Sequence, residues 1–131
     1  MSEHTTVDDL LAEARTQLAR LSPANAHAAT RADAVLVDIR SDTQRARDGT
    51  VPGATFIARN VLEWRLDPSS PHRDPALARR DIRLILICEE GFQSSLAAAT
   101  LTRFGLDATD VVGGFQAWRE AGLPVRQVDA G

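Results

Sequence analysis

The stretch that decides the fold is Ile82-Arg83-Leu84-Ile85-Leu86-Ile87-Cys88-Glu89-Glu90-Gly91-Phe92-Gln93-Ser94. Five of its first six residues are apolar, which indicates a strand buried on both faces of a parallel sheet. A short segment with a glycine follows the only cysteine, and residues 94–104 then have the pattern of a helix that ends at Gly105. The sequence therefore predicts a strand, a tight loop and a helix, with Cys88 where the strand ends.

Strands and helices alternate along the rest of the chain. Residues 34–39, Ala-Val-Leu-Val-Asp-Ile, form a second apolar run, which indicates another buried strand. We expect short strands at 55–57 and 110–112, and helices at 24–31, 60–65 and 115–120. This alternation is typical of an α/β fold with a parallel sheet.

The N-terminal residues predict an additional helix. Thr6-Val7-Asp8-Asp9 has the form of a capping box, and apolar residues recur after it at helical spacing. Ser22-Pro23 is a second start signal, because proline suits the first position of a helix. We expect the first helix to pack on the domain or on another subunit.

Composition limits the class of protein. The 131 residues, 44% of them hydrophobic, fit one domain with a real core. A net charge of -3 gives no electrostatic reason to expect nucleic acid, and no apolar run reaches the length of a membrane span. One cysteine and a polar start without a signal peptide favour a reducing compartment, the cytoplasm. The three histidines are not spaced as metal ligands, so we expect no metal and no cofactor.

The position of Cys88 favours nucleophilic chemistry. A thiol reacts as its thiolate, and a free cysteine has a pKa of about 8.5. A helix start offers unpaired amides and partial positive charge, and Gly91 permits the backbone angles of a tight anion-binding loop. Ser94 and Ser95 are expected to cap the helix, and one hydroxyl to reach the bound anion. The alternative is that Cys88 is a small buried core residue.

Four ordered segments resemble motifs of the rhodanese-like sulfurtransferase family. Cys88-Glu-Glu-Gly-Phe-Gln-Ser94 is similar to the family's Cys-x-x-Gly-x-Arg-Ser loop, and Asp38-Ile39-Arg40 to its Asp-x-Arg strand end. Residues 49–54 resemble its Gly-His-Ile-Pro-Gly-Ala turn, and residues 113–125 its Gly-Gly-Phe-x-x-Trp signature. The resemblance covers about residues 20–126. It implies a helical extension at 1–18, a rhodanese-like domain at 19–127, with helices on both faces of its sheet, and a tail at 128–131.

The resemblance also implies an activity. Cys88 would attack the sulfane sulfur of thiosulfate or a persulfide, hold it as a persulfide and pass it to a thiol acceptor, a protein thiol among the candidates. The loop of residues 88–94, here called the Cys88 loop, would bind substrate and persulfide through Glu89, Glu90, Gly91, Phe92, Gln93 and Ser94. If Phe92 faces solvent, it would offer a contact to an apolar substrate or partner. Donor, acceptor, pathway and the choice between monomer and homodimer stay open.

Departures from the family loop bear on the donor. Gln93 stands where arginine is common, and Glu89 and Glu90 add negative charge. If both carboxylates face the sulfur, they offset much of the help from the helix terminus, so a persulfide rather than thiosulfate is the predicted donor. If they face solvent, salt screens them.

Residues outside the loop complete the predicted site. We expect Arg59 and Arg65, with Glu63 orienting one of them, to form a substrate rim, the alternative being surface ion pairs. Asp38 and Arg40 end a strand at the same sheet edge as Cys88 and are expected to form a supporting polar network.

Two other functions compete with sulfur transfer. Phosphatase or arsenate reductase chemistry needs an arginine at the sixth position after the cysteine, and Ser94 stands there. A regulatory module that binds a partner through the same face is the second alternative. Inactive members of the family usually lack the cysteine, so its presence favours the enzyme.

Overall fold

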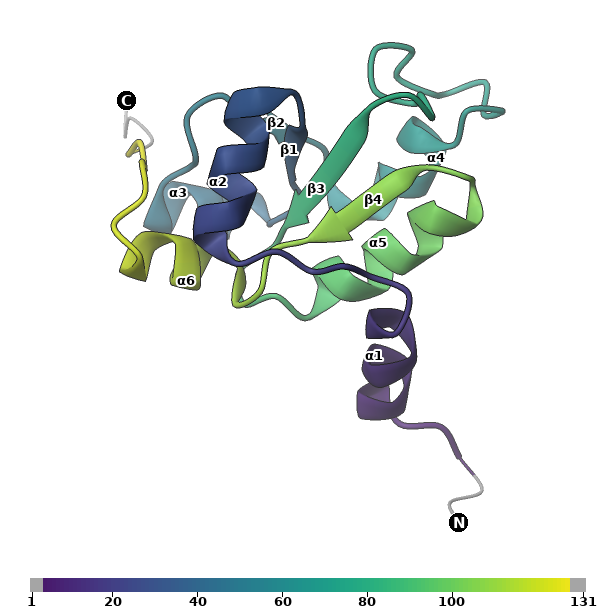
Figure 1. Cartoon of the computed structure of the whole chain (residues 1–131), viewed down its shortest axis with the longest axis horizontal. Helices are drawn as coiled ribbons and strands as arrows, with labels where there is room; N and C mark the ends of the chain where they lie inside the picture. Colours follow the sequence, from purple (N-terminus) through teal and green to yellow (C-terminus); the bar gives the residue numbers. More distant parts are fainter. Residues whose placement is uncertain (1–3, 128–131) are drawn as a thin grey trace.

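The computed structural model describes residues 4–127, so the expected tail at 128–131 lies outside the described residues. Within this range one parallel sheet has the order β2-β1-β3-β4 (Figure 1). Its strands are β1 (Val35–Asp38), β2 (Thr55–Phe56), β3 (Arg83–Ile87) and β4 (Asp107–Asp110). The register pairs Asp38 with Ile87, so β1 and β3 end together and their following residues meet at one sheet edge. The predicted α/β fold is confirmed.

Helices cover both faces of the sheet. They are α1 (Val7–Arg15), α2 (Pro23–Ala32), α3 (Asp42–Asp48), α4 (Leu62–Leu66), α5 (Gln93–Arg103) and α6 (Gly114–Glu120), with a 3-10 turn η1 (Arg59–Val61) before α4. Figure 1 shows α2 and α6 on one side of the strands and α4 and α5 on the other. This arrangement leaves the carboxyl ends of β1 and β3 open to the loops that follow them.

Two hydrophobic cores follow from the alternation of side chains along the central strand. Leu84 and Leu86 of β3, followed by Cys88, pack in the core beneath α4 and α5. Ile85 and Ile87 point to the other face and pack with residues of α2 and α6. Because both faces are covered, the strand reads as a continuous apolar run.

The N-terminal segment packs against α5 and against the β4 edge of the sheet. Thr6 caps α1 through the predicted capping box with Asp9, and α1 packs against the first part of α5 (Figure 1). The helix ends at Arg15, and the chain then runs along the outer edge of β4, where Leu21 forms a parallel bridge with Val111. The segment thereby extends the sheet and lies close to the carboxyl end of β4.

Several expected boundaries were wrong. The last strand covers Asp107–Asp110 rather than 110–112, because these polar residues pair in register with β3. The helix after the Cys88 loop starts at Gln93, one residue earlier than expected, and Phe92 is its N-cap without a side-chain bond. The expectation that Ser94 and Ser95 cap this helix was also wrong, because both hydroxyls donate to Asp110.

Helix α3 was not predicted, although its capping signal is present. Ser41 accepts a hydrogen bond from the Gln44 amide, and the Gln44 side chain accepts one from the Ser41 amide.

Across residues 4–127, no helix combines the length and the apolar character that crossing a membrane requires.

Candidate functional site

Cys88 lies directly after β3, at the open edge of the sheet. The residue is only 2% exposed, and its sulfur accepts a hydrogen bond from the Gly91 amide at 3.1 Å. The Cys88 thiol lies 3.2 Å from the Ser94 hydroxyl oxygen, to which it donates. Gly91 has a φ of 87°, the left-handed conformation that turns its amide back toward the sulfur. The loop therefore folds around the thiol.

The start of α6 packs against the backbone of the Cys88 loop, at Gly114. The Phe115 amide donates to the Cys88 carbonyl at 2.8 Å, and the Gln116 amide to the Glu89 carbonyl at 3.1 Å. A Cβ at Gly114 would lie 2.5 Å from the Cys88 carbonyl oxygen and 2.7 Å from the Gly91 nitrogen. Only glycine permits this approach, so the start of α6 determines the position of the loop.

A buried carboxylate lies behind the thiol. Asp110, at the end of β4, is fully buried and accepts hydrogen bonds from Ser94 and Ser95, each at 2.7 Å. Arg20 donates to both oxygens of the same carboxylate, at 2.8 and 3.2 Å. Asp110 therefore holds the hydroxyl that contacts the sulfur. The sequence did not predict Asp110 as a site residue, because the expected strand at 110–112 placed Asp110 at the beginning of a strand, whereas the observed strand ends there.

Two arginines of the N-terminal segment bind the back of the loop. Arg15 donates to the Gly91 carbonyl at 2.9 Å and Arg20 to the same carbonyl at 3.0 Å. Arg15 also donates to the Ser95 hydroxyl at 3.1 Å. These residues were not predicted to belong to the site.

Glu89 does not present a free charge to the sulfur. Its carboxylate accepts hydrogen bonds from the guanidinium groups of Arg40 at 3.2 Å and Arg47 at 3.4 Å, and from the side-chain amide of Gln116. Two guanidinium groups thus neutralise the Glu89 carboxylate. Its charge therefore gives no reason to expect weak binding of thiosulfate. Glu90 is exposed, where salt screens its charge.

A neighbouring carboxylate belongs to the same cluster. Asp48 accepts two hydrogen bonds from Arg47, at 3.1 and 2.9 Å. The Arg47 hydrogen bonds, followed by the contact with Glu89, hold the pKa of Asp48 well below its usual range. The acidic groups beside the loop are therefore paired with arginine.

Asp38 and Arg40 form a buried network under the loop. The Arg40 guanidinium donates twice to Asp38, at 3.1 and 2.9 Å, and to the Gly49 carbonyl at 2.7 Å. It lies 3.8 Å from the centre of the Phe115 ring. Since Arg40 is 1% exposed and also binds Glu89, it joins the end of β1 to the Cys88 loop.

The expected rim residues divide into two groups. Arg59 pairs with Glu63 at 2.8 Å and lines a cavity of about 490 Å³ that Gln93 of the loop also lines. Arg65 instead donates to the His72 carbonyl and lies 3.9 Å from Asp74, in the long loop before β3. The structure therefore places Arg59 beside the Cys88 loop and Arg65 away from it.

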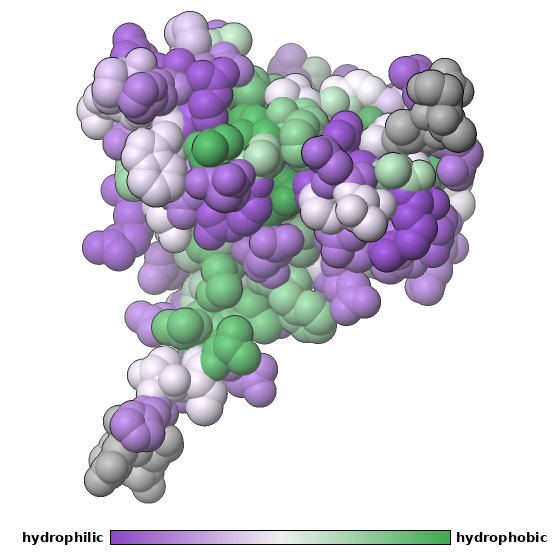
Figure 2. Space-filling view, turned by 180° about the vertical axis from the view of Figure 1, so that it is seen from behind, coloured by the Kyte–Doolittle hydropathy of each residue, from purple (hydrophilic) through white to green (hydrophobic). Residues whose placement is uncertain are grey.

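The other side of the loop is apolar. Phe92 is 56% exposed and lines a cavity of about 410 Å³ with Val7, Leu11 and Leu96. Figure 2 shows a hydrophobic area where α1 meets the body of the molecule. Two cavities thus lie beside the loop, one lined by Arg59 and the other by Phe92, and Gln93 lines both.

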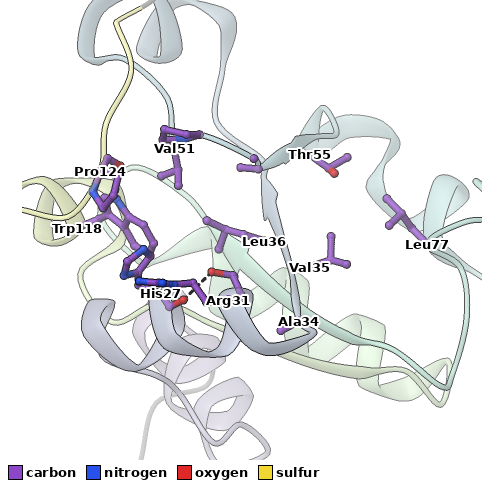
Figure 3. Close-up of a pocket in the computed structure, with 14 residues that line it drawn as sticks. His27, Arg31, Ala34, Val35, Leu36, Val51, Thr55, Leu77, Trp118 and Pro124 are labelled. Atoms are coloured by element: carbon purple, nitrogen blue, oxygen red, sulfur yellow. Dashed lines mark hydrogen bonds between the residues drawn. The ribbon is translucent and has the colours of Figure 1, made fainter.

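A larger cavity lies elsewhere and lacks a nucleophile. It measures about 630 Å³ and lies between α2 and the start of β1, with His27 and Trp118 at one end and Leu77 at the other (Figure 3). Its lining contains no thiol and no carboxylate. This cavity is larger than the two beside the Cys88 loop, but its chemistry does not match that of a thiol site. Among residues 4–127 no three metal-ligating side chains form a group that could hold an ion.

Comparisons with known proteins agree with the motifs. The family model "Rhodanese-like domain" matches residues 22–121. Thiosulfate sulfurtransferase GlpE of Stutzerimonas stutzeri (strain A1501) is 35% identical over 105 residues, which cover 79% of this chain and 87% of that protein. GlpE of Pseudomonas savastanoi pv. phaseolicola is 34% identical over 105 residues, covering 79% and 90%.

One solved structure is similar over almost the whole chain. It is RPA3614 of Rhodopseudomonas palustris CGA009, described as a protein of unknown function and possible tyrosine phosphatase. The identity is 35% with a TM-score of 0.87, and the match covers 96% of this chain and 98% of that one. The likeness extends beyond the family model and takes in the N-terminal segment.

Proposed function

The chain belongs to the rhodanese-like domain family and to its sulfurtransferase class, and from this premise we propose that Cys88 carries sulfane sulfur as a persulfide. The donor that we propose is thiosulfate, the substrate in the names of the curated relatives. The pairing of Glu89 with Arg40 and Arg47 supports this choice, because it removes a charge that would repel a dianion.

The first half-reaction forms the persulfide. The Cys88 thiol loses its proton to solvent, and the thiolate attacks the outer sulfur of thiosulfate. A sulfur–sulfur bond forms at Cys88, the bond within thiosulfate breaks, and sulfite leaves with its electron pair. Since the thiolate no longer donates to Ser94, the Ser94 hydroxyl turns from Asp110 to the sulfur. Asp110 keeps its bonds to Ser95 and Arg20, so the rotation leaves no buried charge unpaired.

The second half-reaction returns the enzyme to its starting state. The acceptor thiolate attacks the outer sulfur of the persulfide, a new sulfur–sulfur bond forms on the acceptor, and the bond to Cys88 breaks. Cys88 leaves as the thiolate and takes up a proton from solvent. Between the two steps the persulfide is an anion, and the Gly91 amide, which donates to the Cys88 sulfur, would stabilise it as an oxyanion hole stabilises its oxygen. Phe92 would contact an apolar part of the acceptor.

One observation carries the proposal: the Cys88 sulfur accepts a hydrogen bond from the Gly91 amide, in a loop that the start of α6 holds in place. A cysteine that only fills the core has no need of such a loop. Sulfur transfer therefore explains the geometry better than a regulatory module, in which the loop would only bind a partner.

Mass spectrometry after incubation with thiosulfate tests the proposal. We expect a mass gain of about 32 Da, one sulfur atom held as a persulfide. The gain should disappear on addition of a small thiol and should be absent in Cys88→Ser. A protein that gains no sulfur from thiosulfate or from a low-molecular-weight persulfide would instead be a binding module.

Phosphatase chemistry, raised by the description of RPA3614, lacks its central residue here. A phosphoryl group in such a loop is bound by the guanidinium fork of an arginine at the sixth position after the cysteine. That position is Ser94, which is buried and donates to Asp110. We therefore favour sulfur transfer over phosphate-ester hydrolysis.

A further inference from the structure

The Cys88 loop carries no cationic side chain of its own. Between Cys88 and Ser94 the charged residues are Glu89 and Glu90, and Gln93 stands in place of an arginine. A loop that binds an anionic donor and then an anionic persulfide still benefits from positive charge nearby. The structure supplies such charge from outside the loop, through the N-terminal segment.

The Gly91 carbonyl is the point of contact. Arg15 and Arg20 both donate to it, at 2.9 and 3.0 Å, over separations of 76 and 71 residues. The carbonyl and the following amide of a trans peptide point in opposite directions, and residues 4–127 contain no cis peptide. With the Gly91 oxygen held by the arginines, the Phe92 amide therefore points away from them. Hydrogen bonds from two cations also polarise this peptide and make its N–H a stronger donor.

The two arginines differ in their charge balance. Arg20 forms a bidentate pair with the carboxylate of Asp110, so its charge is largely neutralised. Arg15 binds only neutral groups, the Gly91 carbonyl and the Ser95 hydroxyl, and has no ion pair with any carboxylate of residues 4–127. Arg15 therefore brings an uncompensated positive charge to the back of the loop.

We propose that Arg15 is a positioning residue that makes the Cys88 loop selective for anionic sulfur donors. It orients the peptide after Gly91 and supplies the positive potential that the loop itself lacks. Arg15 lies outside residues 22–121, the range that the family model matches, so this contribution belongs to the N-terminal segment. The proposal rests on the proposed sulfurtransferase function, but its test does not require sulfur transfer.

Alkylation of the single cysteine provides the test. Iodoacetate is an anion and iodoacetamide is neutral, and each transfers its carbon to the Cys88 sulfur with loss of iodide. The ratio of their rates reports the electrostatic potential at the sulfur, whereas a general change in access alters both rates alike. In Arg15→Gln the ratio of the iodoacetate rate to the iodoacetamide rate should fall about two- to fivefold, the effect of one unit charge within about 10 Å at a near-aqueous dielectric. Arg15→Lys, which keeps the charge, should retain most of the ratio.

Arg103→Gln is the matched control. It removes the same charge from an exposed site at the opposite end of α5 and should leave the ratio unchanged. The rate of the mass gain from thiosulfate should follow the iodoacetate rate in all four proteins. A ratio in Arg15→Gln equal to that of the wild type, or an equal fall in Arg15→Lys or Arg103→Gln, would overturn the proposal. If the wild type gains no sulfur from thiosulfate or from a low-molecular-weight persulfide while the alkylation ratios are as expected, the sulfurtransferase function is contradicted and the role of Arg15 stands.

Discussion

The hydroxyl of Ser94 lies 2.7 Å from the buried carboxylate of Asp110 and within hydrogen-bond distance of the Cys88 sulfur. Ser94 is therefore the one hydroxyl of the described residues that connects the thiol to a charged group. Ser95 binds the same carboxylate, also at 2.7 Å, but has no contact with the sulfur.

This difference makes Ser94 and Ser95 a matched pair of substitutions. Ser94→Ala should slow the formation of the persulfide about tenfold to a hundredfold, because a hydrogen bond to a charged group contributes about 1.5–3 kcal/mol. Ser95→Ala should have a much smaller effect on that rate. The rate of mass gain with thiosulfate is the measurement, and equal losses in the two variants would show that Ser94 acts only through Asp110.

The contact between α6 and the loop predicts a second effect. In Gly114→Ala the new methyl group would meet the backbone of Cys88 and Gly91, so the loop must shift and activity should fall by at least tenfold. Gly53 also has a positive φ, of 83°, but a Cβ there meets nothing within 4 Å. Gly53→Ala should therefore cost about 1 kcal/mol of stability and leave kcat/KM for thiosulfate unchanged. Similar activity in both variants would argue against a fixed loop position.

Much of the fold could be predicted because its signals are local. The run from Leu84 to Ile87 has to be buried on both faces, and Ser22-Pro23 begins a helix wherever the segment is placed. The β4 boundary could not be predicted in this way, since Asp107 and its neighbours have weak intrinsic preference for a strand and pair only because β3 lies beside them.

The candidate site was predictable only where it is contiguous in the chain. Cys88 and its loop occupy seven successive positions, so their motif is visible in the sequence. The bonds of Arg15 and Arg20 to Gly91 span 76 and 71 residues, and those between Arg20 and Asp110 span 90. Such contacts arise when the N-terminal segment passes the edge of β4, which no local pattern indicates.

The cavity beside Gln93 leads to a third prediction. Arg59 lines it and Arg65 does not, although both are arginines of the same helical segment. Arg59→Ala should raise the KM for thiosulfate about two- to fivefold, the effect of one partly exposed charge near a dianion. Arg65→Ala should leave the KM unchanged. If the two variants have the same KM, the cavity does not receive the donor.

The depressed pKa of Asp48 predicts how stability depends on pH. Its hydrogen bonds with Arg47 lower the pKa in the folded state, whereas an unfolded aspartate titrates near 3.9. The contribution of Asp48 to the free energy of unfolding is therefore complete above about pH 5 and is lost as the pH falls through the unfolded and then the folded pKa. Denaturation of Asp48→Asn and of the wild type should give a difference in stability at pH 7 that shrinks toward pH 2. A difference independent of pH would contradict the ion pair.

The last prediction separates the two glutamates of the loop. Glu89 pairs with buried Arg40 and with the more exposed Arg47, so Glu89→Gln should lower the midpoint of thermal unfolding, because the buried guanidinium of Arg40 loses a negatively charged partner. Glu90 is exposed, and Glu90→Gln should leave the midpoint unchanged while raising kcat/KM for thiosulfate by less than about twofold, since salt screens a solvent-facing charge. A much larger gain of activity in Glu90→Gln, suppressed by added salt, would show that this carboxylate faces the donor after all.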